Sequence, residues 1–389
     1  MEVYSLRIII SIISDQPLPN YVFIKEKAQK GDILVFIVTK SMEKKYEEFK
    51  LNLNQEDFHI RKIEFDNIGD EDDYIPMYQF LEAKLKNVLK DRVIENDEFI
   101  VNLTGGTKQI CIATRDIMMK NFKYVKFFYK PINKNSIISF DCNEYSSRLK
   151  YRVSVNEYLG LFGINNFTNH SPVESEKLTN TVFDNFMKLS ESDYDIIDEL
   201  RTYRDKDRKT PYRLDDIERK GYGEKKKAVP KIRQLLEKLG YECVDNELSA
   251  LQIDFLTGGW FEEYCFYLIK RVLNPNDIML NLNIKDNKQN LNELDVIFTL
   301  GNNLYAVECK TGIERIKDFK EIANKAVVLN NKLGRIGSKP YIFSLESKKE
   351  DFVKYAEDNK IGYFDKTYLY DEREVLEKKL LEIKHKAEN

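Results

Sequence analysis

The first 140 residues of the chain contain five short segments that are almost continuously apolar. These segments are Leu6–Ile13, Ile33–Thr39, Ile60–Phe65, Phe99–Leu103 and Tyr124–Tyr129. Between them lie stretches with helical spacing of apolar residues, namely Met42–Leu53, Tyr78–Leu89 and Lys108–Lys120. Strands without a polar face are typical of a parallel sheet that helices cover on both sides. The alternation therefore predicts an α/β fold with a parallel-rich sheet over residues 1–150.

Polar residues follow the first and the fourth of these segments. The carboxyl ends of parallel strands meet at one edge of a Rossmann-like sheet, which is where such sheets bind ligands. Paired glycines let a ligand approach the backbone, and free N–H groups at a helix start suit a phosphate. The candidate ligand-binding residues are Ser14, Asp15, Gln16, Pro17, Asn20, Thr39, Asn102, Thr104, Gly105, Gly106, Thr107 and Lys108. A tight turn that simply starts a helix explains the two glycines equally well, and the motif is neither a P-loop nor G-x-G-x-x-G.

Residues 151–250 have a different pattern, which predicts a mainly helical connector. Within it, Arg201–Arg233 holds 13 Lys and Arg against 6 Asp and Glu. This excess fits either a solvated helical surface or a surface that binds the phosphates of a nucleic acid. A winged-helix module is compatible with the segment, although no decisive pattern indicates one.

The final part of the chain, residues 251–389, is predicted to be a second α/β unit with a β-hairpin. Two strand-like segments, Glu293–Leu300 and Asn303–Lys310, flank a Gly-Asn turn signal. A two-residue turn places Asp295 opposite Glu308, whereas a four-residue turn places Asp295 opposite Lys310. In either register Asp295, Glu308 and Lys310 share one face, because directly paired residues point the same way.

This acidic pair with a lysine indicates metal-assisted chemistry. Carboxylate oxygens bind Mg²⁺ or Mn²⁺, and an ammonium stabilises a developing negative charge. A third carboxylate is expected from the helix Trp260–Leu273, where Glu262 lies on the apolar stripe and Glu263 is the alternative. The competing interpretation of the hairpin is a surface ladder of salt bridges.

The cysteines and histidines exclude several other chemistries. The five cysteines form no C-x-x-C pair, and the chain has only three histidines. This composition favours a reduced, cytoplasmic protein without a zinc knuckle. No apolar run reaches the roughly 18 residues of a membrane helix, so no membrane association is expected.

The order of helix, strand, Asp-bearing strand, Glu-x-Lys strand, helix and strand resembles the PD-(D/E)xK nuclease core. This resemblance implies a restriction-endonuclease-like fold that requires Mn²⁺ or Mg²⁺. It assigns catalytic roles to Glu262, Asp295, Glu308 and Lys310, and metal binding to Asp295, Glu308, Glu262 and the carbonyl of Cys309. Leu294 stands where the family often has a proline. Basic residues nearby are expected to follow the nucleic-acid backbone or to be ordinary helix charges; they are Arg315, Lys317, Lys332 and Arg335.

The N-terminal half resembles CARF domains, the sensors of cyclic oligoadenylates in type III CRISPR systems. The resemblance rests on Asn102–Lys108 after the fourth strand and on a loop expected over Ser14–Asn20 after the first. A CARF domain followed by a PD-(D/E)xK domain is similar to the ancillary CRISPR nucleases that cyclic tetra-adenylate activates. It implies an antiviral endonuclease that works as a homodimer, with the ligand bound across two sensor domains.

Two rival functions remain compatible with the sequence. One is a ligand-responsive transcription regulator in which the helical region binds DNA and the nuclease domain is inactive. The other is a restriction enzyme whose first domain is structural. A HEPN ribonuclease is excluded, because none of the three histidines follows an arginine at the required spacing of four to six residues. The sequence leaves open the ring size of the activator, whether the sensor degrades it, the choice between DNA and RNA, and the cut-site preference.

Overall fold

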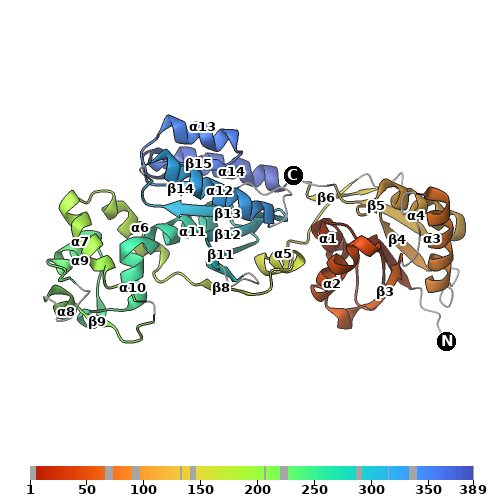
Figure 1. The fold of residues 1–389 in the computed structure, drawn as a ribbon, viewed down its shortest axis with the longest axis horizontal. Helices are drawn as coiled ribbons and strands as arrows, with labels where there is room; N and C mark the ends of the chain where they lie inside the picture. The colour runs from red at the N-terminus through yellow and green to blue at the C-terminus, as the bar shows by residue number, and fades with distance from the viewer. Residues whose placement is uncertain are drawn as a thin grey trace.

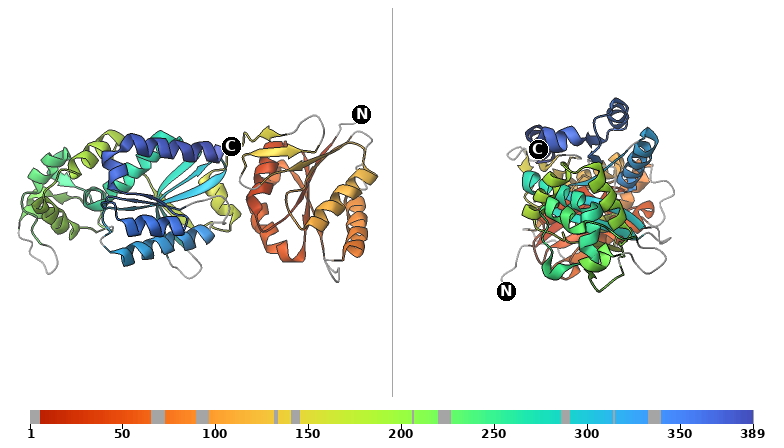
Figure 2. Two further views of the ribbon diagram at one scale, coloured as in Figure 1. Left: turned by 90° about the horizontal axis from the view of Figure 1, so that it is seen from above. Right: turned by 90° about the vertical axis from the view of Figure 1, so that its left-hand side faces the viewer.

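The structure, a computed structural model, consists of two α/β halves placed side by side along the longest axis of the molecule (Figures 1 and 2). It describes residues 6–65, 73–89, 97–131, 134–140, 146–205, 207–219, 227–285, 291–313, 315–332 and 340–388. No helix in these ranges is both long and apolar enough to cross a membrane.

The N-terminal half is built on a seven-stranded sheet with the order β3-β2-β1-β4-β5-β6-β7. Its strands are β1 (Arg7–Ile12), β2 (Ile33–Val38), β3 (His59–Glu64), β4 (Glu98–Asn102), β5 (Val125–Tyr129), β6 (Ser136–Ser139) and β7 (Ser147–Arg148). The first five strands are parallel, as the apolar segments predict, and the last two add antiparallel edges. The chain order reverses between β1 and β4, so this edge is the topological switch point of the sheet.

Helices cover both faces of this sheet, which is why its strands need no polar side. Apolar residues of α1 (Pro17–Lys27) and α2 (Glu43–Leu51) pack on one face. Those of α3 (Tyr74–Leu89) and α4 (Lys108–Asn121) pack on the other. Leu34 and Phe36 point to the first face, and Val35 and Ile37 to the second.

Helix α1 corrects the expectation of a loop over Ser14–Asn20. The helix begins at Pro17 and already includes Asn20. A proline is tolerated in the first helical turn, because the N–H that it lacks has no partner within the helix there. Two prolines, Pro17 and Pro19, therefore mark a helix start here, and the true loop between β1 and α1 is only residues 13–16.

The region predicted as a helical connector divides into three parts. Helix α5 (Val155–Leu161) packs between the two halves, in contact with α1, α2 and the strands β11 and β12 of the C-terminal sheet. Strand β8 (Phe167–His170) is an edge strand of that sheet, paired with β11, and the sequence analysis missed it. The remaining residues form a helical segment with a small two-stranded sheet.

This helical segment, residues 176–254, shares one apolar core with the second sheet domain. It contains α6 (Glu176–Phe186), α7 (Glu191–Arg201), β9 (Tyr212–Arg213), α8 (Leu214–Glu218), α9 (Ile232–Leu239), β10 (Glu247–Leu248) and α10 (Ala250–Asp254). Phe183 stacks on Tyr264 with ring centroids 3.6 Å apart, and Phe186 stacks on Trp260 at 4.2 Å. The segment is therefore firmly packed against the second domain.

The C-terminal sheet is mixed and has the order β15-β14-β13-β12-β11-β8. Its remaining strands are β11 (Asp277–Lys285), β12 (Leu291–Leu300), β13 (Asn303–Lys310), β14 (Tyr341–Ser344) and β15 (Gly362–Phe364). Helices α11 (Trp260–Leu273) and α14 (Arg373–Glu388) pack on one face. Helices α12 (Ile316–Lys332) and α13 (Glu350–Asp358) pack on the other. These elements match the helix, hairpin and strand order expected from the sequence.

The two halves meet at the turn of the β12–β13 hairpin. The side-chain oxygen of Asn302 accepts a hydrogen bond from the Val153 N–H at 2.8 Å, and its amide donates to the Tyr151 carbonyl at 3.1 Å. Asn302 is only 4% exposed and has a φ of +64°, which a turn of this kind requires. The C-terminus lies between the halves (Figure 1), where the Glu388 carbonyl accepts hydrogen bonds from Arg148.

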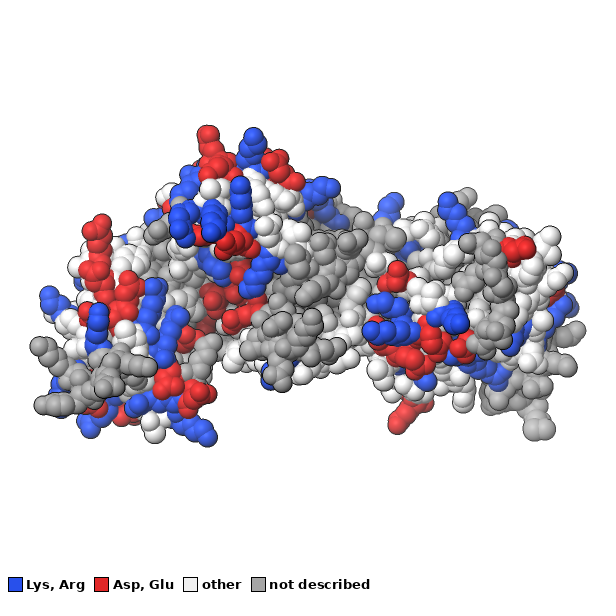
Figure 3. Space-filling view, viewed as in Figure 1, with Lys and Arg blue, Asp and Glu red and all other residues white. Residues whose placement is uncertain are grey.

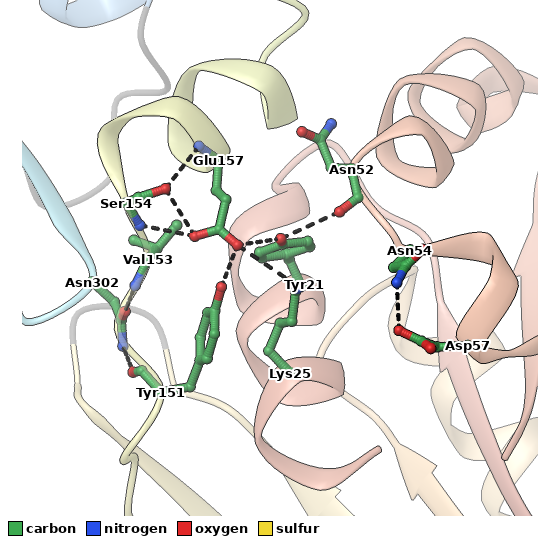
Figure 4. A network of polar contacts seen from close by, with 10 residues as sticks. All are labelled: Tyr21, Lys25, Asn52, Asn54, Asp57, Tyr151, Val153, Ser154, Glu157 and Asn302. Carbon is green, nitrogen blue, oxygen red and sulfur yellow. Dashed lines mark hydrogen bonds and ion pairs between the residues drawn. The ribbon is translucent and has the colours of Figure 1, made fainter. Parts of the chain in front are cut away.

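A polar network continues from this turn into the N-terminal half (Figure 4). Glu157 caps the start of α5 through Ser154, the residue after Val153. The same carboxylate accepts hydrogen bonds from the hydroxyl groups of Tyr151 and, at 2.7 Å, of Tyr21 in α1. Helix α1 itself starts at the ligand edge of the sheet. A continuous set of contacts thus joins that edge to the hairpin of the C-terminal domain.

Candidate nuclease centre and sensor edge

The β12–β13 hairpin has the register of a two-residue turn. Leu300 pairs with Asn303 and Val296 with Val307, so that Asp295 comes opposite Glu308. Of the two predicted registers, the first is the one observed. Asp295 is 6% and Glu308 is 7% exposed.

The Lys310 ammonium is held by three oxygen atoms from this hairpin. Its Nζ lies 3.1 Å from Asp295 Oδ2, 2.9 Å from Glu308 Oε1 and 3.1 Å from the Cys309 carbonyl oxygen. Burial favours the neutral amine, but the two carboxylates outweigh it and raise the pKa of Lys310 above its usual value. Burial, followed by the charge of Glu308, raises the pKa of Asp295 to about 6. The buried hairpin thus makes a cation position lined by oxygen.

Helix α11 offers two carboxylates, and the structure separates their surroundings. Glu263 is 3% exposed and accepts hydrogen bonds from the backbone N–H groups of Val173, at 2.6 Å, and Glu174, at 3.2 Å. Both carboxylates line the cleft beside the hairpin, but no backbone N–H group of the described residues donates to Glu262. Burial, and then the nearby Asp295 carboxylate, raises the pKa of Glu262 to about 8. Of the two alternatives, Glu262 is the one that faces Asp295.

Two further side chains at this centre were not found from the sequence. Asn281 of β11 lies across from Asp295 with a φ of +50°, where the pairing of β11 with β8 also shifts register. It hydrogen-bonds Glu262, and its Oδ1 is buried without a partner among the described residues. Lys325 of α12 places its Nζ 3.8 Å from Glu308. Both depend on pairing between distant segments, so no local signal marks them.

The other basic residues expected near the centre are bound to carboxylates or lie outside the description. Arg315 pairs with Asp318 at 2.8 Å and Lys317 with Glu321 at 3.9 Å, both within one turn of α12. The side chain of Lys332 and the whole of Arg335 lie outside the described residues.

The centre opens into a cleft of about 1220 Å³ between the hairpin, α11 and the helical segment. Among the described residues, no three His, Cys, Asp or Glu side chains stand together as a metal site by themselves, and the Lys310 ammonium lies among the oxygens instead. The donor set nevertheless fits a hard divalent cation, because buried carboxylates and a backbone carbonyl are oxygen ligands. The Asn281 oxygen, which is buried without a partner among the described residues, is a further oxygen that a cation could bind.

The predicted ligand residues of the N-terminal half gather at the switch point between β1 and β4. Asp15, Gly106, Thr107 and Lys108 are exposed there, while Ser14 and Gln16 are half-buried. Thr107 caps α4 by accepting a hydrogen bond from the Ile110 N–H. Pro17 is buried at the start of α1. Thr39 lies on the neighbouring strand end, 6% exposed, with its hydroxyl 3.0 Å from that of Ser41.

Asn20 and Asn102, two of the predicted ligand residues, are buried beneath this edge. Asn20 donates to the Ile12 carbonyl at 2.7 Å, and Asn102 donates to Asn20 at 3.0 Å. The Asn102 oxygen accepts from the N–H and the hydroxyl of Thr104. The Thr104 hydroxyl in turn accepts a hydrogen bond from the N–H of Lys130, a residue that was not predicted from the sequence. The Lys130 side chain is only 7% exposed, and burial lowers its pKa to about 8.

The paired glycines are required by close packing at the same edge. A Cβ on Gly105 would lie 1.9 Å from the Ile12 carbonyl oxygen. Gly106 has a φ of +79°, and its Cβ would lie 2.5 Å from the Ile12 side chain. The loop after β4 therefore sits directly on the end of β1, which explains these glycines more specifically than a generic tight turn does.

Fold and site together define a two-domain protein, with a Rossmann-like ligand domain joined to a restriction-endonuclease-like domain. Family models assign both parts. Residues 8–158 match the Card1 CARF domain, and residues 250–383 match the endonuclease domain of Card1-like proteins. The chain therefore carries a CARF domain of the Card1 type followed by a Card1-like endonuclease domain. No curated protein gives a significant match.

Solved structures share this architecture. Protein VC1899 from Vibrio cholerae is 17% identical, with a TM-score of 0.72 over 97% of this chain and 98% of that one. Can2 from Sulfobacillus thermosulfidooxidans, solved with cyclic tetra-adenylate, is 20% identical with a TM-score of 0.66 and the same coverage. A type III CRISPR defence DNA nuclease activated by cyclic oligoadenylate is 10% identical, with a TM-score of 0.52 over 93% of this chain and 50% of that one. At these identities the likeness concerns the fold.

Proposed function

We propose that this protein is a metal-dependent endonuclease of type III CRISPR defence, activated by a cyclic oligoadenylate. The observation that carries the proposal is the convergence of Asp295, Glu308 and the Cys309 carbonyl on one cation position at the base of an open cleft. Cyclic tetra-adenylate is the activator of choice, because Can2, a structural neighbour along its whole length, was solved with that ligand.

Asp295, Glu308, the Cys309 carbonyl and Glu262 would hold the divalent ion, Mn²⁺ or Mg²⁺. When bound, the ion polarises the phosphodiester and lowers the pKa of the attacking water. Lys310 would turn from the carboxylates towards the phosphate and stabilise the charge that develops there. Glu262, which lines the cleft beside the hairpin, would contribute a further carboxylate oxygen to the ion.

The activator would bind at the exposed edge formed by residues 14–16 and 104–108. A cyclic ligand with two-fold symmetry can make the same contacts with this edge in two copies of the protein. We therefore propose a homodimer with the ligand between the two sensor domains. The ligand favours the active arrangement only if it binds that arrangement more tightly. The contacts from α1 through Glu157 to Asn302 are the route by which the edge would bias the nuclease hairpin.

Two matched variants test the two halves separately. Glu308→Gln keeps the shape of the side chain but removes its charge, so cleavage should fall by about two orders of magnitude or more while binding of cyclic tetra-adenylate is retained. Lys108→Ala should weaken ligand binding and leave the metal centre intact. Full cleavage by Glu308→Gln, measured on labelled DNA and RNA with Mn²⁺ and the ligand, would contradict the assignment of the centre.

A further inference from the structure

The helical segment, residues 176–254, forms the wall of the nuclease cleft that faces the catalytic hairpin. Most of it lies between the parts of the chain that the two family models cover. Glu262, Glu293 and Lys310 line the cleft together with a set of residues from the helical segment, namely Arg201, Arg204, Asp205, Arg208 and Lys209. Figure 3 shows acidic side chains gathered in the middle of the C-terminal half, with basic side chains of the helical segment beside them.

Two arginines of this wall bind residues that directly precede α11. Arg201 Nε donates to the Thr257 carbonyl at 3.1 Å, and Arg204 Nε lies 3.2 Å from Asp254 and 2.6 Å from the Thr257 hydroxyl. These contacts fix the turn that starts α11, the helix that carries Glu262. Both guanidinium groups are therefore committed to positioning the catalytic helix.

Two neighbouring cations are free for a different role. Arg208 and Lys209 are exposed on the same wall and make no ion pair within the described residues. The Arg208 guanidinium lies 3.8 Å from the centroid of the Tyr212 ring, and its Nε donates to the Thr210 carbonyl at 2.8 Å. Stacking of this kind holds a guanidinium in place without neutralising it.

We propose that Arg208 and Lys209 bind the phosphate backbone of the nucleic-acid strand that lies in the cleft. This role rests on the proposed nuclease function and on the positive charges of the two side chains beside an acidic cleft floor. The floor of the cleft is acidic and repels phosphates until a metal is bound, so affinity for the strand has to come from its walls. Phosphodiester groups next to the scissile one meet the two cations across the cleft from Glu262. Backbone contacts of this type position a strand without reading its sequence.

The test measures binding of labelled single-stranded DNA and, in a second arm, single-stranded RNA by fluorescence anisotropy. Cyclic tetra-adenylate is present, and EDTA prevents cutting. In the double variant Arg208→Gln/Lys209→Gln, the Kd should rise about tenfold. The magnitude of the slope of log K against log salt should decrease by about 1.4, because each of the two lost phosphate contacts contributes roughly 0.7. Arg208→Lys should keep the salt slope. Lys188→Gln, an exposed charge on the same segment away from the cleft, is the matched control and should change neither quantity.

Different results separate this inference from the proposed function. An unchanged Kd and salt slope in the double variant, with the wild-type protein binding and cutting nucleic acid, would overturn the inference and leave the nuclease function standing. A wild-type protein that neither binds nor cuts either strand would overturn both. The fluorescence of Trp260 checks that each variant is folded, because this buried residue of α11 stacks on Phe186 of the helical segment.

Discussion

The substitution Glu262→Gln should stabilise the metal-free protein, and only at high pH. The carboxyl of Glu262 has a pKa of about 8 in the folded protein, against an ordinary value of 4.5. Between these pH values the folded state keeps a proton that the unfolded chain releases. Stability of the wild type therefore decreases as the pH rises through this window, whereas glutamine has nothing to ionise.

The expected size follows from the pKa. Each pH unit of the window from 4.5 to about 8 contributes about 1.4 kcal/mol, and part of the effect belongs to the neighbouring Asp295 carboxyl, so the variant should gain a few kcal/mol above pH 8 (roughly two to four). The advantage should fall below about 1 kcal/mol near pH 5, where the carboxyl is mostly neutral in the folded state. With Mn²⁺ bound, the wild type should be the more stable of the two proteins, because the ion binds the Glu262 carboxylate and the variant offers one carboxylate fewer.

The assay is urea unfolding in EDTA, followed by tryptophan fluorescence. Trp260 is the only tryptophan and lies in α11, two residues before Glu262, so its signal reports on the domain in question. The comparison of low and high pH is an internal control, because it uses the same two proteins. An equal difference in stability at both pH values, or a variant less stable than the wild type at high pH, would refute the reasoning.

Three other substitutions test the remaining parts of the account. Asn302→Gly keeps the positive φ and removes the interdomain hydrogen bonds of this side chain with Val153, Tyr151 and Asn135, each worth about 1 kcal/mol. The stimulation of cleavage by ligand should therefore fall about tenfold while ligand binding stays intact. Unchanged stimulation would exclude the hairpin turn as the coupling point. Gly105→Ala should lower the affinity for cyclic tetra-adenylate by about tenfold or more, because the new Cβ would clash with the Ile12 carbonyl and displace the loop. Calorimetric titration measures this affinity, and an affinity equal to that of the wild type would mean that the loop is not part of the sensor. Lys310→Met should abolish cleavage yet tighten Mn²⁺ binding, because the ammonium competes for the same oxygens; weaker Mn²⁺ binding would contradict that competition.

Local patterns predicted the elements whose signals are local. The continuous apolar strands of the first sheet and the alternation along the β12–β13 hairpin were sufficient for the parallel sheet and for the shared face of Asp295, Glu308 and Lys310. The hairpin register was one of two alternatives, and both led to the same face. The glycines after β4 were singled out for the approach of a ligand or for a tight turn, and the structure adds a third reason, their close packing against Ile12.

Features that depend on distant contacts could not be predicted in this way. Strand β8 is short and mostly exposed, and it forms because it pairs with the edge of β11, which lies over a hundred residues later in the chain. The hydrogen bond from Asn102 to Asn20 joins residues 82 positions apart in the chain, so no local pattern marks it. Asn281 reaches the nuclease centre only because β11 departs from regular geometry at that residue.

The most direct measurement of the central claim is cleavage with and without the activator. Purified protein is incubated with labelled single-stranded DNA, single-stranded RNA and supercoiled plasmid in Mn²⁺, with and without cyclic tetra-adenylate, and Glu308→Ala is run alongside. The account predicts cutting of at least one substrate only when the ligand is present, and none by the variant. Cleavage that ignores the ligand, or that survives in Glu308→Ala, would contradict the account.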